Sequence, residues 1–500
     1  MSTSTGPSWR CTCQPSKWAD VCSGLQCQVV DTRGGWRVLR LVSPHTEELL
    51  AEVPISTAEE IDAAVNAARA AIDAGPWPRM APGERVEMLR RFAEVYRAHG
   101  KEIAQLITAE IGAPITFAQR AQIGLPAMMI GAFCDTAQGY DWQEIRPGFF
   151  GSDIHVRKEP VGVVAAIVPW NMPQFLTIAK LVPALLAGCA VIVKPAPETS
   201  LDALYLVKLF EEVGLPPGVM TVLPGDNTVG ERLVSHPGID KVSFTGSTVV
   251  GKAVAAACAA NLTKVSLELG GKSAAIVLDD ADPATVAAGV RSASLSNSGQ
   301  ICNALTRILV PATRQQQFVD ALAAEIDAIK VGDPTDPQTQ LGPLVNRRQQ
   351  QRVLDYIGIG QDEGARLVVG GTDAPAGVDR GWYVRPTLFA EAQNSMRIAQ
   401  EEIFGPVLTV IGYRDEQEAA ALANDSGYGL AGSVWTADTD RGLAIAAQIK
   451  TGTFGVNQGY TMDPFAPFGG VKDSGYGREL GREGLEGYLD TKSIAVAAGV

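Results

Sequence analysis

Between residues 160 and 271 the chain alternates short apolar runs with longer amphipathic segments. The runs are Val161–Val168, Ala190–Val193, Val219–Leu223, Lys241–Thr245 and Lys264–Leu269. Short, continuous apolar runs are typical of buried parallel strands, and the segments between them suit crossover helices. The pattern predicts an α/β fold with a doubly wound parallel sheet.

Sheets of this kind bind ligands at the carboxyl ends of their strands. Five residues stand at or just after those predicted ends: Asn171, Lys194, Gly225, Gly246 and Glu268. The carboxyl edge of the sheet is therefore the predicted binding site.

Other elements flank this region. Thr57 and Glu60 form a predicted capping box that starts an amphipathic helix, and a second helix follows around Val86–Tyr96. A further α/β series after Glu268 has four predicted strands, Ala274–Leu278, Arg307–Val310, Val407–Ile411 and Ser433–Thr436. Residues 140–159 and 486–498 alternate polar and apolar side chains, which indicates extended structure.

Charge and hydropathy exclude several classes of partner. Among 500 residues, 42 Lys and Arg against 55 Asp and Glu give a net charge of −13. This balance disfavours nucleic acid and anionic membranes as partners. No apolar run reaches the roughly 18 residues of a membrane span, and residues 1–30 lack the apolar core of a secretory signal. We expect a cytoplasmic enzyme.

Histidine and cysteine usage narrows the chemistry. There are only four histidines, so mechanisms that pair a serine or cysteine with histidine have little to draw on. Cys134, Cys189 and Cys258 lie among small apolar residues and are expected to be buried and inert. The N-terminal cysteines match no compact zinc module and have no histidine nearby, so no metal is expected. These four cysteines are Cys11, Cys13, Cys22 and Cys27.

One thiol has different surroundings. The run from Ser294 to Cys302 places Cys302 just after the pair Gly299 and Gln300, which predicts a sharp turn that exposes the sulfur. Polar neighbours are compatible with partial thiolate character. Glu268 ends an otherwise apolar strand, where burial should raise the pKa of its carboxyl toward neutrality. An ion pair with Lys264 or Lys272 is the alternative for Glu268.

These two motifs, with Pro169–Pro173 and Phe244–Ser247, resemble the aldehyde dehydrogenase superfamily from about residue 41 to the C-terminus. The resemblance implies a dinucleotide-binding domain (41–139 and 160–268), a catalytic domain (269–485) and a small oligomerisation sheet (140–159 and 486–500). Residues 1–40 remain unmatched. A homodimer or homotetramer is implied in the same way.

The resemblance also implies a mechanism. Cys302 adds to an aldehyde, and the resulting hemithioacetal loses hydride to become a thioester. The Asn171 amide and the Cys302 backbone N–H stabilise the oxyanion. Glu268 activates the water that hydrolyses the thioester, and Lys180 helps to relay the proton. Asn171 taken alone would be explained equally by a turn bounded by prolines.

NAD is the cofactor that the resemblance implies. Its predicted contacts are Trp170, Lys194, Gly225, Gly246, Ser247, Leu269, Glu402 and Phe404. Members that prefer NAD often carry a glutamate three residues after the lysine. Here that position is Pro197, with Glu198 one step later, so NADP is not excluded.

By the same resemblance, six residues line the substrate tunnel: Met172, Leu176, Ala179, Ile301, Met462 and Phe468. This wall is uncharged, and Ala179 stands where many relatives have a bulky aromatic residue. We therefore expect an uncharged aliphatic, aromatic or terpenoid aldehyde. Two alternatives remain: a coenzyme A acylating dehydrogenase, disfavoured by Glu268, and a catalytically silent binding protein, disfavoured because Cys302, Glu268 and Asn171 are all present.

Overall fold

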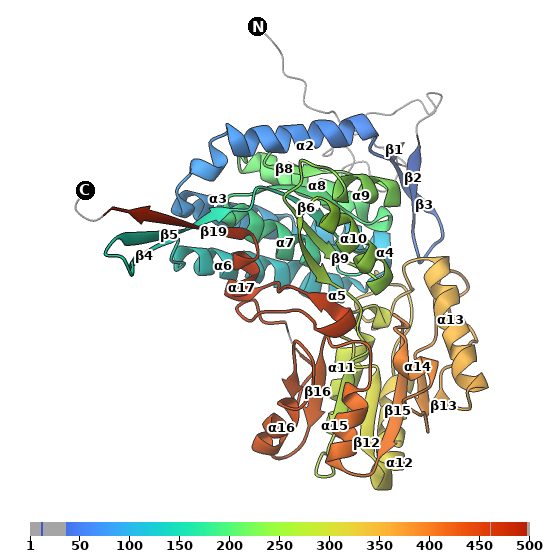
Figure 1. Cartoon of the computed structure of the whole chain (residues 1–500). Coiled ribbons are helices and arrows are strands. Elements are labelled where there is room, and N and C mark those ends of the chain that lie inside the picture. Colours follow the sequence, from blue (N-terminus) through green and yellow to red (C-terminus); the bar gives the residue numbers. More distant parts are fainter. Residues whose placement is uncertain (1–11, 14–36, 461, 498–500) are drawn as a thin grey trace.

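The computed structural model describes residues 12–13, 37–460 and 462–497 (Figure 1). The expectations for residues 1–11 and 14–36, including those for Cys11, Cys22 and Cys27, lie outside the described residues. So does the expectation for the side chain of Cys13.

A six-stranded sheet forms the centre of one half of the molecule, in the order β18-β10-β9-β6-β7-β8. Five of its strands are parallel, as the apolar runs predict, and only β18 is antiparallel. The strands are β6 (Val163–Ile167), β7 (Ala190–Lys194), β8 (Met220–Val222), β9 (Lys241–Thr245), β10 (Lys264–Glu268) and β18 (Gly475–Tyr476). The prediction of complete burial is wrong for β8 and β10, because β8 is an edge strand and β10 has, on the side away from β9, only the two-residue strand β18 as a neighbour.

Helices cover both faces of this sheet, as a doubly wound fold requires. One face packs against α2 (Ala58–Asp73), α9 (Asn227–Val234) and α10 (Thr248–Ala260). The other packs against α7 (Pro173–Ala187) and α8 (Ser200–Glu212). Three more helices pack outside α7 and α8: α3 (Pro82–Ala98), α4 (Gly100–Ile111) and α6 (Leu125–Gln138). Both predicted N-terminal helices are present, and Thr57 and Glu60 form the predicted capping box of α2.

A seven-stranded sheet forms the other half, in the order β13-β14-β15-β12-β11-β16-β17. The four predicted strands are β11 (Ala274–Val277), β12 (Arg307–Pro311), β15 (Val407–Tyr413) and β16 (Gly432–Trp435). Sequence analysis missed β13 (Arg366–Val369), β14 (Thr387–Ala390) and β17 (Gly455–Val456). One face is covered by α11 (Pro283–Leu295) and α12 (Gln315–Asp327). The other is covered by α13 (Arg347–Asp362), α14 (Arg397–Gln400), α15 (Glu416–Asn424) and α16 (Thr439–Ala446).

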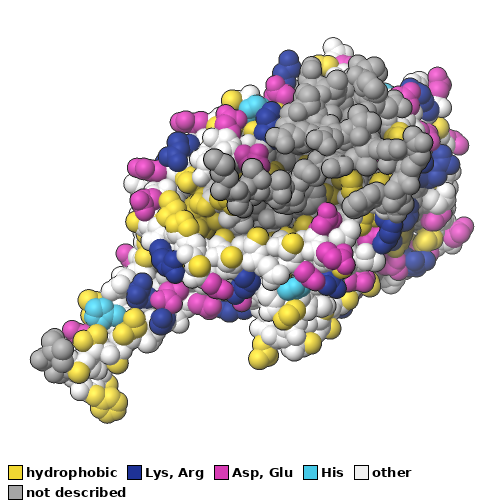
Figure 2. All heavy atoms as spheres, turned by 90° about the horizontal axis from the view of Figure 1, so that it is seen from above, with side chains coloured by type: hydrophobic (Ala, Val, Ile, Leu, Met, Phe, Trp, Pro, Cys, Tyr) yellow, Lys and Arg dark blue, Asp and Glu magenta, His cyan; other side chains and the backbone are white. Residues whose placement is uncertain are grey.

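Two small antiparallel sheets complete the fold. β2 (Val38–Val42) and β3 (Leu49–Pro54) pair with each other, and β1 (Thr12–Cys13) pairs with β3. The second sheet consists of β4 (Gln143–Pro147), β5 (Asp153–Pro160) and β19 (Leu489–Val496), and the short helix α17 (Gly481–Glu486) precedes β19. This second sheet projects from the body of the molecule (Figure 1), and its apolar side chains are open to solvent at the projecting end (Figure 2). Phe149 and Phe150, in the turn between β4 and β5, are almost fully exposed.

No helix among the described residues combines the length and the apolar character that a membrane crossing needs.

Candidate active site

The predicted site residues gather where the two large sheets meet. Residues from the carboxyl edge of the six-stranded sheet face residues that immediately precede strands of the seven-stranded sheet: Cys302 comes before β12, Phe404 before β15 and Tyr428 before β16. Between them lies a cavity of about 650 Å³. It is lined by nine predicted site residues: Trp170, Asn171, Leu176, Gly246, Ser247, Leu269, Cys302, Glu402 and Phe404.

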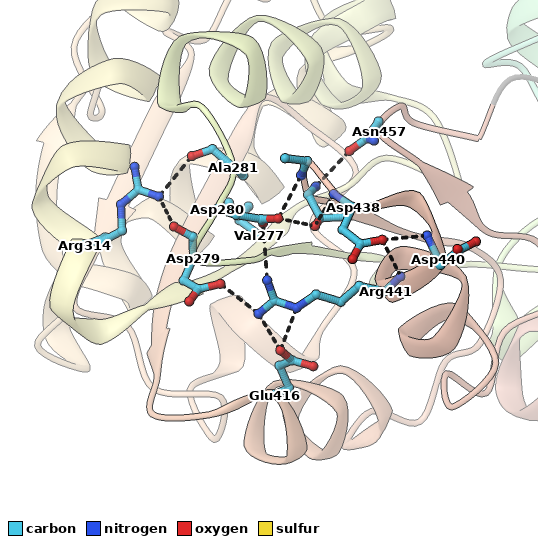
Figure 3. A network of polar contacts seen from close by, with 12 residues as sticks. Val277, Asp279, Asp280, Ala281, Arg314, Glu416, Asp438, Asp440, Arg441 and Asn457 are labelled. Carbon is cyan, nitrogen blue, oxygen red and sulfur yellow. Dashed lines mark hydrogen bonds and ion pairs between the residues drawn. The ribbon is translucent and has the colours of Figure 1, made fainter.

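The carboxyl-edge rule does not hold for the seven-stranded sheet. Its carboxyl edge carries a polar network instead, centred on Arg441 of α16 (Figure 3). The guanidinium of Arg441 contacts the carboxylates of Asp279, Asp280 and Glu416, at 2.7, 3.5 and 2.5 Å. This network joins α15 and α16 to the end of β11, at the edge opposite Cys302.

The loop before Cys302 has an uncommon backbone. Asn297, Ser298 and Gly299 have successive φ values of 50°, 57° and 72°, all in the left-handed region. At residue 299 a Cβ atom would lie 2.4 Å from the carbonyl carbon and oxygen of Gly405, so only glycine fits. The turn predicted at Gly299 and Gln300 is present. Side chains hold it: Ser298 Oγ donates to the Gly342 carbonyl at 2.8 Å.

Cys302 is partly exposed at the cavity, yet its thiol is strongly desolvated. Burial, followed by the nearby carboxylates of Glu402 and Glu268, raises the pKa of Cys302 to about 12. This direction is opposite to the expected partial thiolate character, because burial and two carboxylates both disfavour a negative charge on the sulfur. The other described cysteines, Cys134, Cys189 and Cys258, are fully buried.

Asn171 lies on the loop between β6 and α7 and is held from several sides. Its Nδ2 donates to the Gln300 carbonyl at 2.9 Å, which leaves the second amide hydrogen free to point elsewhere. Its own carbonyl accepts from Asn297 Nδ2 at 2.9 Å and from Gln122 Nε2 at 3.2 Å. The Asn171 loop and the Cys302 loop are thus joined directly.

Glu268 ends β10 with a buried carboxylate. Within the described part of the chain, neither of its oxygens has a hydrogen-bond partner. Desolvation, followed by the nearby Glu479 carboxylate, raises the pKa of Glu268 well above its ordinary value, while Lys180 and Arg478 act in the opposite direction. The predicted raised pKa is confirmed. The alternative ion pairs are not formed, since Lys264 pairs with Asp490 instead and neither lysine bonds Glu268.

Lys180 lies on α7 and is completely buried. It forms an ion pair with Glu479, whose own side chain is only 6% exposed. Glu479 is held in place by backbone bonds with Phe468 in both directions, at 2.6 and 2.8 Å. The C-terminal motif therefore brings a second carboxylate to the side of Glu268, a placement that sequence analysis missed.

Glu402 and Phe404 lie on the loop before β15. The Glu402 carboxylate accepts from the Gly271 N–H at 3.0 Å, and burial raises its pKa to about 7. Phe404 has a φ of 62° and its ring meets Trp170 edge-on at 5.4 Å. Helix α13 holds this loop: Gln349 Nε2 donates to the Phe404 carbonyl at 2.7 Å, and Arg352 Nη2 to the Glu402 carbonyl at 2.5 Å. Sequence analysis gave no signal for Gln349 or Arg352, because they are ordinary polar residues of a helix.

Other predicted cofactor contacts surround the same cavity. Ser247 caps α10, accepting from the Val250 N–H, so the N-terminus of this 13-residue helix opens into the cavity. Lys194 and Gly225 lie beyond the cavity lining. Lys194 is buried, which lowers its pKa to about 8, while nearby Glu198 and Asp226 act to raise it.

Most of the predicted tunnel residues belong to the apolar core next to the cavity, and only Leu176 lines the cavity itself. Met172, Leu176, Ala179 and Phe468 belong to one hydrophobic cluster, and Met462 and Cys302 pack against it. Ile301 is partly exposed next to Cys302 and is not a member of that cluster. Ala179 is buried among the apolar residues of that cluster and does not line the cavity.

Comparisons with known proteins agree with this arrangement. Residues 30–494 match the model of the aldehyde dehydrogenase family, so the match begins before residue 41, where the sequence motifs placed it. The chain is 47% identical over 454 residues to geranial dehydrogenase of Castellaniella defragrans, covering 91% of this chain and 94% of that protein. It is 39% identical over 468 residues to phenylacetaldehyde dehydrogenase of Pseudomonas fluorescens, covering 92% of this chain and 93% of that protein.

Solved structures give the same result. An aldehyde dehydrogenase of Mycobacterium tuberculosis in complex with NAD+ superposes with a TM-score of 0.90 at 46% identity, covering 93% of this chain and 95% of that chain. A variant of aldehyde dehydrogenase C of Pseudomonas syringae, in complex with NAD+ and octanal, superposes with a TM-score of 0.89 at 41% identity. The match covers 92% of this chain and 93% of that chain. The fold and site are those of an oxidoreductase built from two facing α/β sheets. The chain belongs to the aldehyde dehydrogenase family.

Proposed function

We propose that this protein oxidises an uncharged, apolar aldehyde to the carboxylic acid with NAD, through a thioester on Cys302 that Glu268-activated water hydrolyses. One observation carries the proposal. Two loops and the end of β10 bring together a thiol at the cavity, an amide on Asn171 with one hydrogen to spare, and the buried carboxylate of Glu268, which has no hydrogen-bond partner among the described residues.

The residues of the cavity fit a dinucleotide. Thr245 Oγ1 is buried without a partner among the described residues and lines the cavity, so it is ready to bind a polar group. The first turn of α10 offers backbone N–H groups to a pyrophosphate. Glu402 would hold the nicotinamide ribose, Phe404 and Trp170 the ring, and Lys194 the adenine ribose. NAD supplies the hydride acceptor when it is bound.

Cys302 begins the reaction. Its high pKa means that the sulfur carries a proton at neutral pH, and this proton must leave as sulfur attacks the carbonyl carbon. Glu268 lies close enough to raise that pKa and is the proposed acceptor. The free hydrogen of Asn171 Nδ2 and the Cys302 N–H then stabilise the oxyanion.

Glu268 completes the reaction. The Cys302 proton first passes from Glu268 to the buried pair of Lys180 and Glu479, which returns Glu268 to its carboxylate form. After hydride has left, this carboxylate takes a proton from water, and the hydroxide attacks the thioester and displaces the Cys302 sulfur as a thiolate. A raised pKa suits a base that works near neutral pH. The buried pair of Lys180 and Glu479 lies next to Glu268 and can carry the proton away. A base in this position favours water over coenzyme A as the acyl acceptor.

The apolar cluster around Cys302 supports an apolar substrate. The relatives named for geranial and phenylacetaldehyde, and the structure with octanal, support the same class. We also propose that the small sheet of β4, β5 and β19 joins subunits, because it exposes Phe149 and Phe150. Light scattering would detect a dimer or tetramer, whereas a monomer would refute this assignment. A cytoplasmic location remains an expectation from composition.

The test is reduced-cofactor formation by the purified protein with octanal, geranial, phenylacetaldehyde and succinic semialdehyde. NAD and NADP are compared, with and without coenzyme A, and Cys302→Ala is the matched control. We expect turnover of the three apolar aldehydes without coenzyme A and none by Cys302→Ala. Undiminished turnover by Cys302→Ala would refute the thioester, and turnover that requires coenzyme A would favour the acylating alternative.

A further inference from the structure

Gln122 is a polar side chain buried in an apolar part of the fold. It lies in a seven-residue π-helical segment, Ala118–Gly124, that joins α5 (Ile115–Phe117) to α6. Its side chain is completely buried, and its neighbours Ala118 and Ile123 belong to the large hydrophobic cluster. Burying an amide without partners is costly, so its contacts should account for its position. π-helical turns are also frequent at functional sites.

All of the side-chain contacts of Gln122 are with the start of α7. Its Nε2 donates to the Asn171 carbonyl at 3.2 Å and to Met172 Sδ at 3.2 Å. Its Oε1 accepts from the Phe175 N–H at 3.5 Å. Its backbone carbonyl accepts from the Tyr96 hydroxyl at 3.0 Å, which fixes the π-helical turn against α3.

These contacts supply a cap that α7 lacks. Met172 is the N-cap residue of α7, and its side chain accepts no capping hydrogen bond from the first turn of the helix. Phe175, three residues later, is the position whose N–H an N-cap side chain normally satisfies. The Gln122 amide takes over this role from another element and binds the preceding carbonyl at the same time.

The carbonyl that Gln122 binds belongs to Asn171. The peptide unit of Asn171 is therefore held by Gln122 on one side and by Asn297 on the other, while its side chain bonds Gln300. Without the Gln122 amide, the Asn171 carbonyl keeps only its hydrogen bond from Asn297. The loop then loses one of the two side chains that fix the direction of the Asn171 side chain. A shift of the order of 1 Å in such a group can cost about 10²-fold in rate.

We propose that Gln122 is a positioning residue for the oxyanion donor Asn171, acting by capping α7 from the neighbouring π-helical turn. This inference rests on the proposed function, which gives Asn171 its role. Gln122 does not belong to the cavity lining, and its side-chain hydrogen bonds reach the site through Asn171 and the start of α7.

The test is a double-mutant cycle that combines Gln122→Met with Asn171→Ala, with Gln119→Met as control. Methionine matches glutamine in length and keeps the packing but makes neither amide bond. Gln119 lies on the same turn with an exposed side chain. For each variant, kcat, the KM for NAD and the melting temperature are measured.

We expect Gln122→Met to lower kcat about tenfold with an unchanged KM for NAD, and Gln119→Met to match the wild type. When Asn171 is already alanine, adding Gln122→Met should lower kcat no further. Three results would overturn the inference. The losses in kcat of the two single variants could multiply in the double variant, or Gln122→Met could have a wild-type kcat. The third is a kcat that falls only in step with the melting temperature. An Asn171→Ala variant with wild-type kcat would instead overturn the oxyanion role in the proposed function.

Discussion

Gly469 faces Glu268 so closely that a Cβ atom at residue 469 would lie 2.6 Å from Glu268 Oε1. Gly469 also has a φ of 156°, and β18 of the same motif pairs with β10 beside Glu268. The C-terminal motif thus forms one wall of the space in which the Glu268 carboxylate lies.

Gly469→Ala should therefore displace the Glu268 carboxylate. We expect kcat to fall about 10- to 100-fold, because a base displaced by a fraction of an ångström no longer meets the attacking water. The first turnover of reduced cofactor should slow as well, because the same carboxylate is the proposed acceptor of the Cys302 proton. Rapid-mixing kinetics measures both quantities. Gly131→Ala on α6, where an added Cβ has no atom within 4 Å, is the control and should behave as wild type.

The raised pKa of Glu268 predicts the pH profile. A protonated carboxyl cannot accept a proton from water, so kcat should fall as the pH drops through the raised pKa. The acid limb should accordingly lie well above the ordinary carboxyl value of 4.5. Glu268→Gln should remove this limb and slow both the first turnover and the hydrolysis, because the amide accepts a proton from neither Cys302 nor water. An acid limb that persists unchanged in Glu268→Gln would assign it to another group.

The buried pair of Lys180 and Glu479 should matter for stability as well as for rate. Lys180→Met leaves the Glu479 carboxylate buried and unpaired, and we expect a loss of about 3–5 kcal/mol in the free energy of unfolding. The double variant Lys180→Met with Glu479→Leu should recover most of that stability but not the rate of thioester hydrolysis. Urea denaturation and single-turnover kinetics separate the two effects. Equal stability of the single and double variants would contradict this account.

Cofactor preference should depend on the charges around Lys194. Two carboxylates, Glu198 and Asp226, lie near this lysine and should repel a 2′-phosphate, so we expect NAD to be preferred over NADP although Pro197 provides no carboxylate. Asp226→Asn keeps a capping side chain at the start of α9 and should raise kcat/KM for NADP about tenfold. Lys194→Ala is the control and should weaken both cofactors. An unchanged ratio in Asp226→Asn would exclude Asp226 from the discrimination.

The Arg441 network should contribute to stability alone. Arg441→Met breaks contacts with three carboxylates that are partly open to solvent, so we expect a loss of about 1–2 kcal/mol that shrinks at high salt. Activity should not change, because the network lies at the edge of its sheet opposite Cys302. Arg366→Met, which breaks one exposed pair with Glu391, is the control and should cost about 0.5 kcal/mol or less. Calorimetry at two salt concentrations measures both.

Local sequence patterns account for much of the fold. The apolar runs predicted the five parallel strands of the six-stranded sheet, because continuous burial of a strand needs only a few adjacent residues. The short strands β13, β14 and β17 were missed, since their neighbours in the sheet decide their conformation. The motif around Cys302 predicted a turn because glycine at residue 299 permits a left-handed backbone.

The sequence by itself determined the two α/β series, the turn before Cys302 and the choice of Cys302, Asn171 and Glu268 as candidates for the site. Only the tertiary structure decided the pKa values of these side chains and the hydrogen bonds that hold them. Burial raises the pKa of Cys302, and Lys180 forms its ion pair with Glu479 and not with Glu268. Gln122 caps a helix that begins 51 residues later, at Pro173. The physical reason is that a motif specifies backbone and side chains within a few residues. Desolvation and hydrogen bonding depend instead on which distant segments exclude water from the same place.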